Sequence, residues 1–369
     1  MLYYLFEYIE NHFHTPGFGL FRYITFRSSL AAITALFICF YIGPKIIRKL
    51  QDHQIGEAKK IDGPKSHWSK AGTPTMGGII VILAGILPVL LWSDLRNTSV
   101  VVICAGTVAL ALVGFLDDYL KVIKKYPNGL IGRYKLMGQF VVGLFVGLVV
   151  YCSHDFNGHN TFTTLPFLKN MELNFGYLYI PVAIFLVMAT SNAVNLTDGL
   201  DGLAIGLFTI TMLAMAVICY VTGNAVYAKY LNIIHLQGAG ELTIFIAAMV
   251  GAGLGFLWYN SYPAQVFMGD TGSLALGGAF GILAILVKKE LFIPILGGIF
   301  FLETISVIIQ RLYFKYTKKK YGTGKRVFKM APIHHHFEVI GWQEPKIVMR
   351  FYIIGILLAI ITLASFKIR

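Results

Sequence analysis

Residues 98–116 form an uncharged run that is followed by two adjacent acids: Thr98-Ser-Val-Val-Val-Ile-Cys-Ala-Gly-Thr-Val-Ala-Leu-Ala-Leu-Val-Gly-Phe-Leu-Asp117-Asp118. A helix of about 20 apolar residues is long enough to cross the hydrocarbon core of a bilayer. Its backbone amides must be satisfied within the helix, because the bilayer core offers no water. The run therefore predicts a transmembrane helix that carries two carboxylates to one membrane surface.

Nine more apolar runs of comparable length predict ten transmembrane helices in all. They cover residues 23–43, 76–93, 135–153, 175–193, 202–222, 241–259, 271–288, 291–313 and 346–366. Of the 369 residues, 56% are hydrophobic and 13% are charged, about half the charged share of a soluble domain. Barrel strands would be about ten residues long with alternating polarity, and these runs are neither. We predict an all-α polytopic membrane protein, with residues 1–369 forming one integral membrane domain.

Lysine and arginine are distributed unevenly between the two sets of loops. The loops after the first, third and ninth runs, with the run ends beside them, contain 22 of the 31 basic residues. Basic loops stay in the cytoplasm, which predicts that both termini lie on the outer, periplasmic side of a bacterial inner membrane. Orientation and anionic membrane lipids then explain the net charge of +13, and no nucleic acid is expected as a partner.

Five acids lie at the predicted cytoplasmic ends of the runs: Asp117, Asp118, Asp198, Asp201 and Asp270. Carboxylates at membrane depth are costly, and they therefore mark candidate functional sites. Each alone is compatible with a solvated helix end, but five on one face are harder to explain in that way. Carboxylate oxygens suit Mg²⁺, which proteins usually hold by one or two carboxylates together with substrate phosphates.

Two glycine-containing segments place further polar groups beside these acids. Residues 192–202 read Asn-Ala-Val-Asn-Leu-Thr-Asp-Gly-Leu-Asp-Gly, and the spacing of Asn195, Asp198 and Asp201 predicts one face of a helical turn. Residues 269–273 read Gly-Asp-Thr-Gly-Ser at a predicted helix start, where free backbone N–H groups would bind phosphate and the aspartate would hold a metal. Asn and Asp side chains can also hydrogen-bond a nucleobase or a ribose. An ordinary helix terminus with Asx turns is the alternative interpretation.

Two other segments carry cations near the same face. Residues 70–78 read Lys-Ala-Gly-Thr-Pro-Thr-Met-Gly-Gly, which is not a Walker A loop because the lysine precedes the glycines. Residues 332–338 read Pro-Ile-His-His-His-Phe-Glu, and these histidines lack the i, i+4 spacing of a helical zinc site. We expect the imidazoles to contact a diphosphate rather than a metal. Phe267 is a candidate for stacking on a base, although an interfacial aromatic more often packs against lipid or core.

Together, the segments 70–78, 117–118, 192–202, 269–273 and 332–338 resemble those of the phospho-N-acetylmuramoyl-pentapeptide transferases, in the polyprenyl-phosphate N-acetylhexosamine-1-phosphate transferase superfamily. The resemblance covers essentially the whole chain. It implies transfer of phospho-N-acetylmuramoyl-pentapeptide from UDP to undecaprenyl phosphate, giving lipid I and UMP, the first membrane step of peptidoglycan synthesis. It also implies a requirement for Mg²⁺ and a homodimer, which nothing in composition or spacing indicates.

The resemblance further implies roles for individual residues. Asp117 matches the family's candidate for deprotonating the lipid phosphate, with Asp118 beside it, and Asp270 matches the Mg²⁺ ligand. The positions that match the nucleotide and inhibitor pocket and the histidine motif are Lys70, Thr75, Asn195, Asp198, Asp201, Asn260, Phe267, Gly269, Ser273, Gln310, His334, His335 and His336. The chemistry agrees, because phosphoryl transfer depends mainly on positioning and charge neutralisation. The sequence leaves open whether an aspartate forms a covalent intermediate, and we favour direct attack with Asp117 as base.

Two other functions compete with this one. A related enzyme that transfers N-acetylglucosamine 1-phosphate to a polyprenyl phosphate would use the same aspartates and metal, although residues 70–78 and 334–336 favour the muramoyl-pentapeptide enzyme. A lipid or solute transporter would place charges near the middle of several runs. Here the acids gather at one face, and Glu303 is the main candidate for a charge inside a run. A packed or hydrogen-bonded helix residue is an equally good interpretation of Glu303.

Overall fold

The computed structural model describes residues 1–13, 17–53, 70, 72–126, 129–156, 158–168 and 171–368. Its α-helices are α1 (Leu2–Phe13), α2 (Ile24–Asp52), α3 (Gly78–Trp92), α4 (Thr98–Asp118), α5 (Gly132–Cys152), α6 (Tyr179–Thr197), α7 (Leu203–Gly223), α8 (Ala225–Leu231), α9 (Leu242–Asn260), α10 (Gly269–Leu286), α11 (Ile293–Leu296), α12 (Gly298–Tyr321), α13 (Ile333–Val339) and α14 (Glu344–Ile368). Tighter or wider helical turns are η1 (Phe18–Arg22), η3 (Tyr119–Ile123), η4 (Gly176–Leu178), η5 (Ala239–Glu241) and η6 (Glu290–Phe292), and the two strands are β1 (Phe162–Thr164) and β2 (Glu172–Asn174).

Each predicted run coincides with a helix or with the broken pair α11–α12, which confirms the all-α membrane architecture. Within the described ranges, eight helices are long and apolar enough to span a membrane. The segments Glu290–Leu296 and Gly298–Tyr321 meet at 80° and make a ninth span if they are counted as one. α3 is shorter, with 15 residues. The number ten therefore stays a prediction, and residues 54–69 and 71 of the first basic loop lie outside the described residues.

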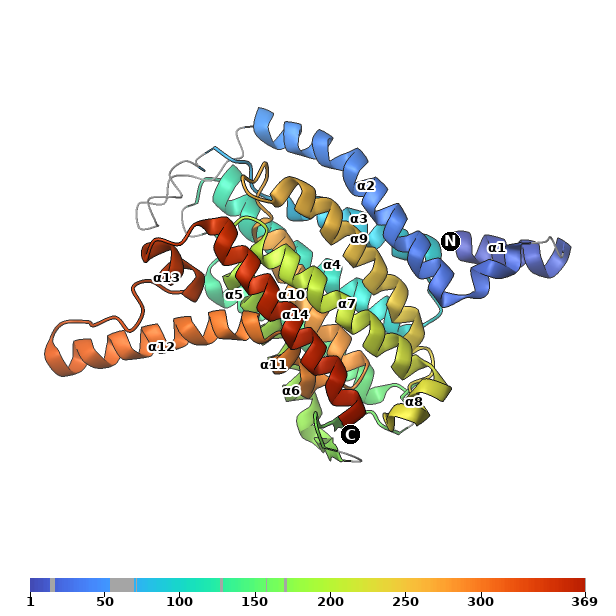
Figure 1. The fold of residues 1–369 in the computed structure, drawn as a ribbon. Helices are drawn as coiled ribbons and strands as arrows, with labels where there is room; N and C mark the ends of the chain where they lie inside the picture. Colours follow the sequence, from blue (N-terminus) through green and yellow to red (C-terminus); the bar gives the residue numbers. More distant parts are fainter. Residues whose placement is uncertain are drawn as a thin grey trace.

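α10 lies at the centre of the bundle, packed against α4, α6 and α3 (Figure 1). All of its residues after the first two are buried, so its side chains contact protein rather than lipid. Gly114 of α4 lies against the backbone of Asp270, and Gly78 of α3 lies against that of Gly272, where a Cβ would overlap the neighbouring backbone. Small residues at such crossings let membrane helices approach closely. The first turn of α10 is therefore held between α3 and α4.

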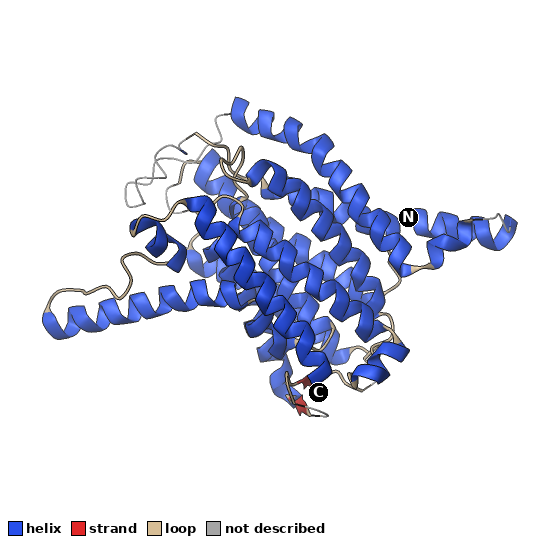
Figure 2. Cartoon of the chain, in the orientation of Figure 1, coloured by secondary structure: helices blue, strands red, loops and turns tan. Residues whose placement is uncertain are grey.

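The two ends of the bundle carry different elements (Figure 1). The end of α4, the start of α10, α13 and the start of α14 lie at one end, while α1, α8 and both chain termini lie toward the other. The amino group of Met1 donates to the carbonyl of Leu90, near the end of α3. Figure 2 shows the hairpin β1–β2, which pairs Phe162 with Asn174, near the C-terminus. The two termini thus share one end, as predicted, and the side of the membrane that this end faces stays a prediction.

Candidate active site

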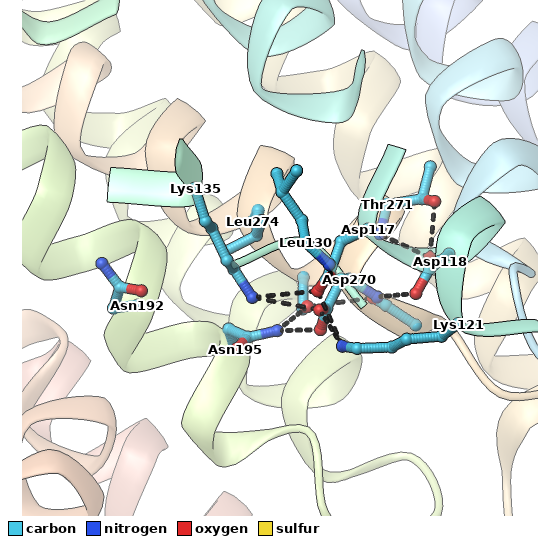
Figure 3. A network of polar contacts seen from close by, with 12 residues as sticks. Asp117, Asp118, Lys121, Leu130, Lys135, Asn192, Asn195, Asp270, Thr271 and Leu274 are labelled. Carbon is cyan, nitrogen blue, oxygen red and sulfur yellow. Dashed lines mark hydrogen bonds and ion pairs between the residues drawn. The ribbon is translucent and has the colours of Figure 1, made fainter. Parts of the chain in front are cut away.

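Two carboxylates from different helices meet at the start of α10 (Figure 3). The Lys121 ammonium lies 2.7 Å from Asp117 Oδ2 and 2.8 Å from Asp270 Oδ2. The Lys135 ammonium lies 3.0 Å from the same Asp270 oxygen and 3.5 Å from the same Asp117 oxygen. The second oxygen of Asp117 accepts a hydrogen bond from the backbone N–H of Leu130 at 2.7 Å. Two cations therefore balance two anions, with Asp117 buried and Asp270 partly exposed.

Asp118 is turned toward the N-terminus of α10 instead of toward the two lysines (Figure 3). Its Oδ1 accepts from the N–H of Asp270 at 3.1 Å, and its Oδ2 accepts from the N–H and the hydroxyl of Thr271 at 2.9 and 2.6 Å. A carboxylate at this place satisfies orphan amides and interacts favourably with the helix dipole. The expectation of free N–H groups for phosphate is therefore wrong at residues 270 and 271. Asp118 holds the helix turn that carries Asp270.

Asn195 of α6 reaches the same turn from a third helix. Its side-chain N–H group donates to Asp270 Oδ1 at 2.6 Å and to the Ser273 hydroxyl at 2.8 Å. That hydroxyl in turn donates to the carbonyl of Gly269 at 2.9 Å. The Thr75 hydroxyl lies beside Gly269, 3.1 Å from the point where a Cβ would be. The structure thus gathers Thr75, Asn195, Gly269 and Ser273 around Asp270. Their place in a nucleotide pocket, which the family resemblance implies, stays a prediction.

The end of α6 corrects one expectation about the loop that follows it. α6 ends at Thr197, and Asp198 already has non-helical backbone angles. Gly202 has a φ of +79°, in the left-handed region that favours glycine, so the chain turns sharply before α7. Asn195, Asp198 and Asp201 therefore do not share one helical face. Asn195 faces Asp270, whereas the Asp201 side chain belongs to a second cluster.

This second cluster joins three segments that are far apart in the sequence. The Lys70 ammonium lies 2.6 Å from Asp201 Oδ1 and 2.6 Å from Glu344 Oε1. The other oxygen of Asp201 accepts from the N–H of Ala264 at 3.0 Å. Burial by itself lowers the Lys70 pKa, but the two carboxylates outweigh it and raise that pKa above its ordinary value. Lys70 therefore stays protonated between two acids.

Asn260 and Phe267 lie next to the second cluster. Asn260 accepts from the N–H of Gly202 at 3.1 Å and donates to the carbonyl of Val266 at 2.9 Å, which ties the α6–α7 loop to the α9–α10 segment. The Phe267 ring centroid lies 6.0 Å from the Lys70 ammonium, at the outer limit of a cation–π contact. Its backbone N–H donates to the carbonyl of Pro74 at 2.8 Å. One ring thus lies next to the lysine and is placed by the segment that carries Thr75.

The three histidines do not act as one group. His334 is fully buried, its Nδ1 lies 3.1 Å from Glu303 Oε2, and its ring lies against Gly199. The expectation that His334 contacts a diphosphate is therefore wrong for this conformation, because no part of it is exposed. Glu303 is also fully buried beside His334, so it is a packed helix residue. α13 is thereby attached to α12 and to the α6–α7 loop.

His335, His336 and Gln310 make local contacts near this junction. His335 Nδ1 lies 2.6 Å from Glu338 Oε2, and His336 Nδ1 accepts from the N–H of Lys329 at 3.1 Å. The side-chain oxygen of Gln310 accepts from the N–H of Phe328 at 2.9 Å, and its amide N–H donates to the same residue's carbonyl. Gln310 therefore fixes the loop that leads from α12 to α13, and the two partly exposed histidines lie in α13.

Sequence reasoning missed three charged residues of these clusters: Lys121, Lys135 and Glu344. Lys121 follows Asp117 by four residues, the spacing of an ion pair on one helix face, and this signal was available. Lys135 lies near the start of an apolar run and looks like any other basic residue there. Glu344 is an acid at the start of the last run, on the predicted cytoplasmic side. Their partners are far away in sequence and could not be assigned.

Two family profiles match the parts of the chain that contribute most of these residues. The profile of Glycosyl transferase family 4 matches residues 100–288, and the phospho-N-acetylmuramoyl-pentapeptide-transferase signature 1 matches residues 70–82. The chain is 51% identical to the phospho-N-acetylmuramoyl-pentapeptide-transferase of Chloroherpeton thalassium over the full length of both proteins. It belongs to the phospho-N-acetylmuramoyl-pentapeptide-transferase family. Members from Salinibacter ruber and Chlorobium chlorochromatii are 51% and 50% identical, again over all of both chains.

Membership in the phospho-N-acetylmuramoyl-pentapeptide-transferase family agrees with the two clusters. The family 4 match contains Asp117, Asp118 and Asp270, and the signature contains Lys70 and Thr75. The histidine segment and Glu344 lie outside both matched ranges, but the full-length similarity to this transferase family includes them. The chain is therefore a membrane enzyme of the transferase class.

Proposed function

We propose that this protein transfers phospho-N-acetylmuramoyl-pentapeptide from its UDP carrier to undecaprenyl phosphate, releasing UMP and forming lipid I. The observation that carries the proposal is the pair Asp117–Asp270 with its two shared lysines, at one end of a membrane bundle in a chain of this family. Such a site meets a lipid phosphate from the membrane and a water-soluble nucleotide from solution. The reaction would be the first membrane step of peptidoglycan synthesis.

The donor set of this pair fits a magnesium ion. Asp117 Oδ2 and Asp270 Oδ2 converge on the same two ammonium groups, so both carboxylates already point at one centre of positive charge. Hard oxygen donors, few protein ligands and room for phosphate oxygens are what Mg²⁺ requires. Asp270, the more exposed of the two, would hold the ion. When bound, Mg²⁺ would neutralise charge that develops on the diphosphate as UMP leaves.

The chain's own residues supply the rest of the chemistry. Asp117 would accept the proton of the lipid phosphate, whose second ionisation lies near pKa 6 and therefore needs only a weak base. Lys121 and Lys135 would bind phosphate oxygens and orient the two reacting groups, since positioning and charge neutralisation dominate phosphoryl transfer. Asp118 keeps the Asp270 turn in place. Direct attack by the lipid phosphate needs no covalent enzyme intermediate.

The second cluster is proposed to bind the nucleoside. Lys70 offers N–H donors, and the ring of Phe267 offers a face for stacking on a base. Asp201 and Asn260 are buried and hold Lys70 and the surrounding loops in place. Thr75 lies in the segment between the two clusters, beside Gly269. A UDP-linked donor that spans both clusters would place its base near Phe267 and its diphosphate near the lysines.

The same proposal includes the setting of the enzyme. We place the site on the cytoplasmic side of the inner membrane, with ten spans in a single domain and both termini outside, because the cations gather in the loops of one side. Homodimer formation is expected from the family resemblance. A transporter is disfavoured, because Glu303, the acid expected within a run, is fully buried against His334.

The direct test is release of UMP by the purified protein in lipid nanodiscs. Release should require UDP-N-acetylmuramoyl-pentapeptide, undecaprenyl phosphate and Mg²⁺ together, and chelation of the metal should stop it. Release with UDP-N-acetylglucosamine would instead favour the N-acetylglucosamine 1-phosphate transferase. No release with either donor would refute a transferase function and favour the transporter.

A second measurement separates base from nucleophile at Asp117. Asp117→Asn should depress kcat strongly and leave uridine nucleotide affinity nearly unchanged. If Asp117 is a base, the rate of the variant should recover at high pH, because the lipid phosphate then ionises unaided. An absence of recovery, with the wild type active over the same range, would support the covalent route, since an amide cannot form that intermediate.

A further inference from the structure

Glu344, the first residue of α14, lies between two segments that the proposed function assigns to nucleoside binding. Its Oε1 is 2.6 Å from the Lys70 ammonium and accepts from the backbone N–H of Asp201 at 2.7 Å. The residue is only 8% exposed, so both contacts form away from bulk solvent. One oxygen of Glu344 thus holds a side chain from the segment before α3 and the backbone of the α6–α7 loop.

Among the described residues, the charges of this cluster do not balance. Lys70 contributes one positive charge, while Asp201 and Glu344 contribute two negative charges, all three at most 14% exposed. A phosphate brought to this cluster would meet a net negative site and would have to displace a carboxylate from the lysine. At the Asp117–Asp270 pair, in contrast, two ammoniums face two carboxylates, and the third carboxylate there, Asp118, is already bound by the N–H groups of Asp270 and Thr271. Phosphate is therefore better accommodated at the pair, and the Lys70 cluster suits an uncharged group.

We propose that Glu344 is a positioning residue for the uncharged nucleoside end of the donor. It would orient the Lys70 side chain and fix the position of the loop that carries Asp201. This inference rests on the proposed function and adds a residue and a division of labour to it. Lys70 would act as a fixed hydrogen-bond donor to the nucleoside rather than as a phosphate ligand. Phosphate neutralisation would be left to the two lysines of the other cluster.

The geometry separates this role from simple attachment of α14. Tyr352, two turns further along α14, donates a hydrogen bond to the carbonyl of Gly202 at 2.6 Å. α14 therefore holds the same loop at two points, one charged and in contact with Lys70, the other neutral and without such a contact. If Glu344 only attached α14 to the loop, loss of either point would have the same effect. If Glu344 positions Lys70, the two losses differ.

The test compares Glu344→Gln with Tyr352→Phe in steady-state assays with both substrates varied. Glu344→Gln keeps the shape and removes the charge, and it should raise the KM for the UDP donor about tenfold, equivalent to about 1.4 kcal/mol. We expect kcat and the KM for polyprenyl phosphate to stay within about threefold of wild type. Tyr352→Phe should leave the donor KM within about twofold. Calorimetry with uridine monophosphate should show the same order of affinities.

A double-mutant cycle with Lys70→Gln gives the sharper outcome. If Glu344 acts through Lys70, adding Glu344→Gln to the lysine variant should change the donor KM much less than it does alone. Fully additive effects, equal effects of the Glu344 and Tyr352 variants, or a loss of kcat with unchanged donor KM would each overturn the inference. A wild-type protein that releases no UMP would instead refute the proposed function. Glu344→Asp, which keeps the charge, provides a second variant if Glu344→Gln fails to fold.

Discussion

Asp118→Asn is predicted to destabilise the first turn of α10, which carries Asp270. The carboxylate accepts three hydrogen bonds from Asp270 and Thr271, at 2.6 to 3.1 Å, and an amide has only one oxygen to replace two. At best the amide oxygen keeps the two contacts with Thr271, while the NH₂ group faces the N–H of Asp270, donor against donor. One charge-assisted bond is then lost, about 1.5–3 kcal/mol, together with the interaction of a charge with the helix dipole, about 0.3–1 kcal/mol.

The expected total is therefore a loss of about 2–4 kcal/mol in the free energy that stabilises the start of α10. Because Asp270 lies in this turn, part of the loss should appear as weaker metal binding; about 1.4 kcal/mol would raise the Mg²⁺ requirement tenfold. The assays are thermal unfolding of the detergent-purified protein and a Mg²⁺ titration of UMP release. High Mg²⁺ should restore much of the activity, since Asp118 does not itself contact the reacting groups in this interpretation.

Thr271→Val is the matched control for this prediction. It removes only the hydroxyl contact at 2.6 Å and leaves the carboxylate, both N–H contacts and the dipole interaction in place. The free energy of unfolding should fall by about 1.5 kcal/mol, with little change in the Mg²⁺ requirement. The reasoning would be refuted if Asp118→Asn abolished activity at every Mg²⁺ concentration while its Tm matched that of the wild type. Asp118 would then act in the chemistry itself.

Three further predictions concern the metal, the orientation and the opposite end of the bundle. Asp270→Asn should abolish UMP release, and raising Mg²⁺ should recover little of it, because a negative ligand is lost; near-normal turnover would remove Asp270 from the ligand set. A single cysteine at Lys319 should react with an impermeant thiol reagent only from the cytoplasmic side, and one at Asn160 only from outside, in a background without other reactive cysteines; the reverse pattern would overturn the placement of the site. Burial lowers the pKa of Lys288 to about 7, well below its ordinary value near 10.4. Between these two pH values the folded state therefore binds fewer protons than the unfolded state. Stability should therefore rise from pH 7 to 9, by about 2 kcal/mol from this group, and an identical rise in Lys288→Met would contradict this assignment.

The sequence alone determined the helices and showed which acids lie at their ends. Length and polarity of an apolar run are local properties, and a helix that rises 1.5 Å per residue converts them directly into a membrane span. The acids at the run ends were visible for the same reason, since charge near a long apolar segment is rare. The sequence predicts a helix start within residues 269–273, and this is confirmed, since α10 begins at Gly269.

Only the tertiary structure decided which charges meet. Lys70 and Glu344 are separated by 274 positions, and Lys135 and Asp270 by 135, distances over which no periodicity carries information. The same reason explains why Asp118 and Asp117, identical neighbours in sequence, take different roles. Successive helical residues point about 100° apart, so one carboxylate faces the lysines and the next faces the amides of α10. Which of them faces the chemistry depends on where α10 and α5 pack, and that is a property of the assembled bundle.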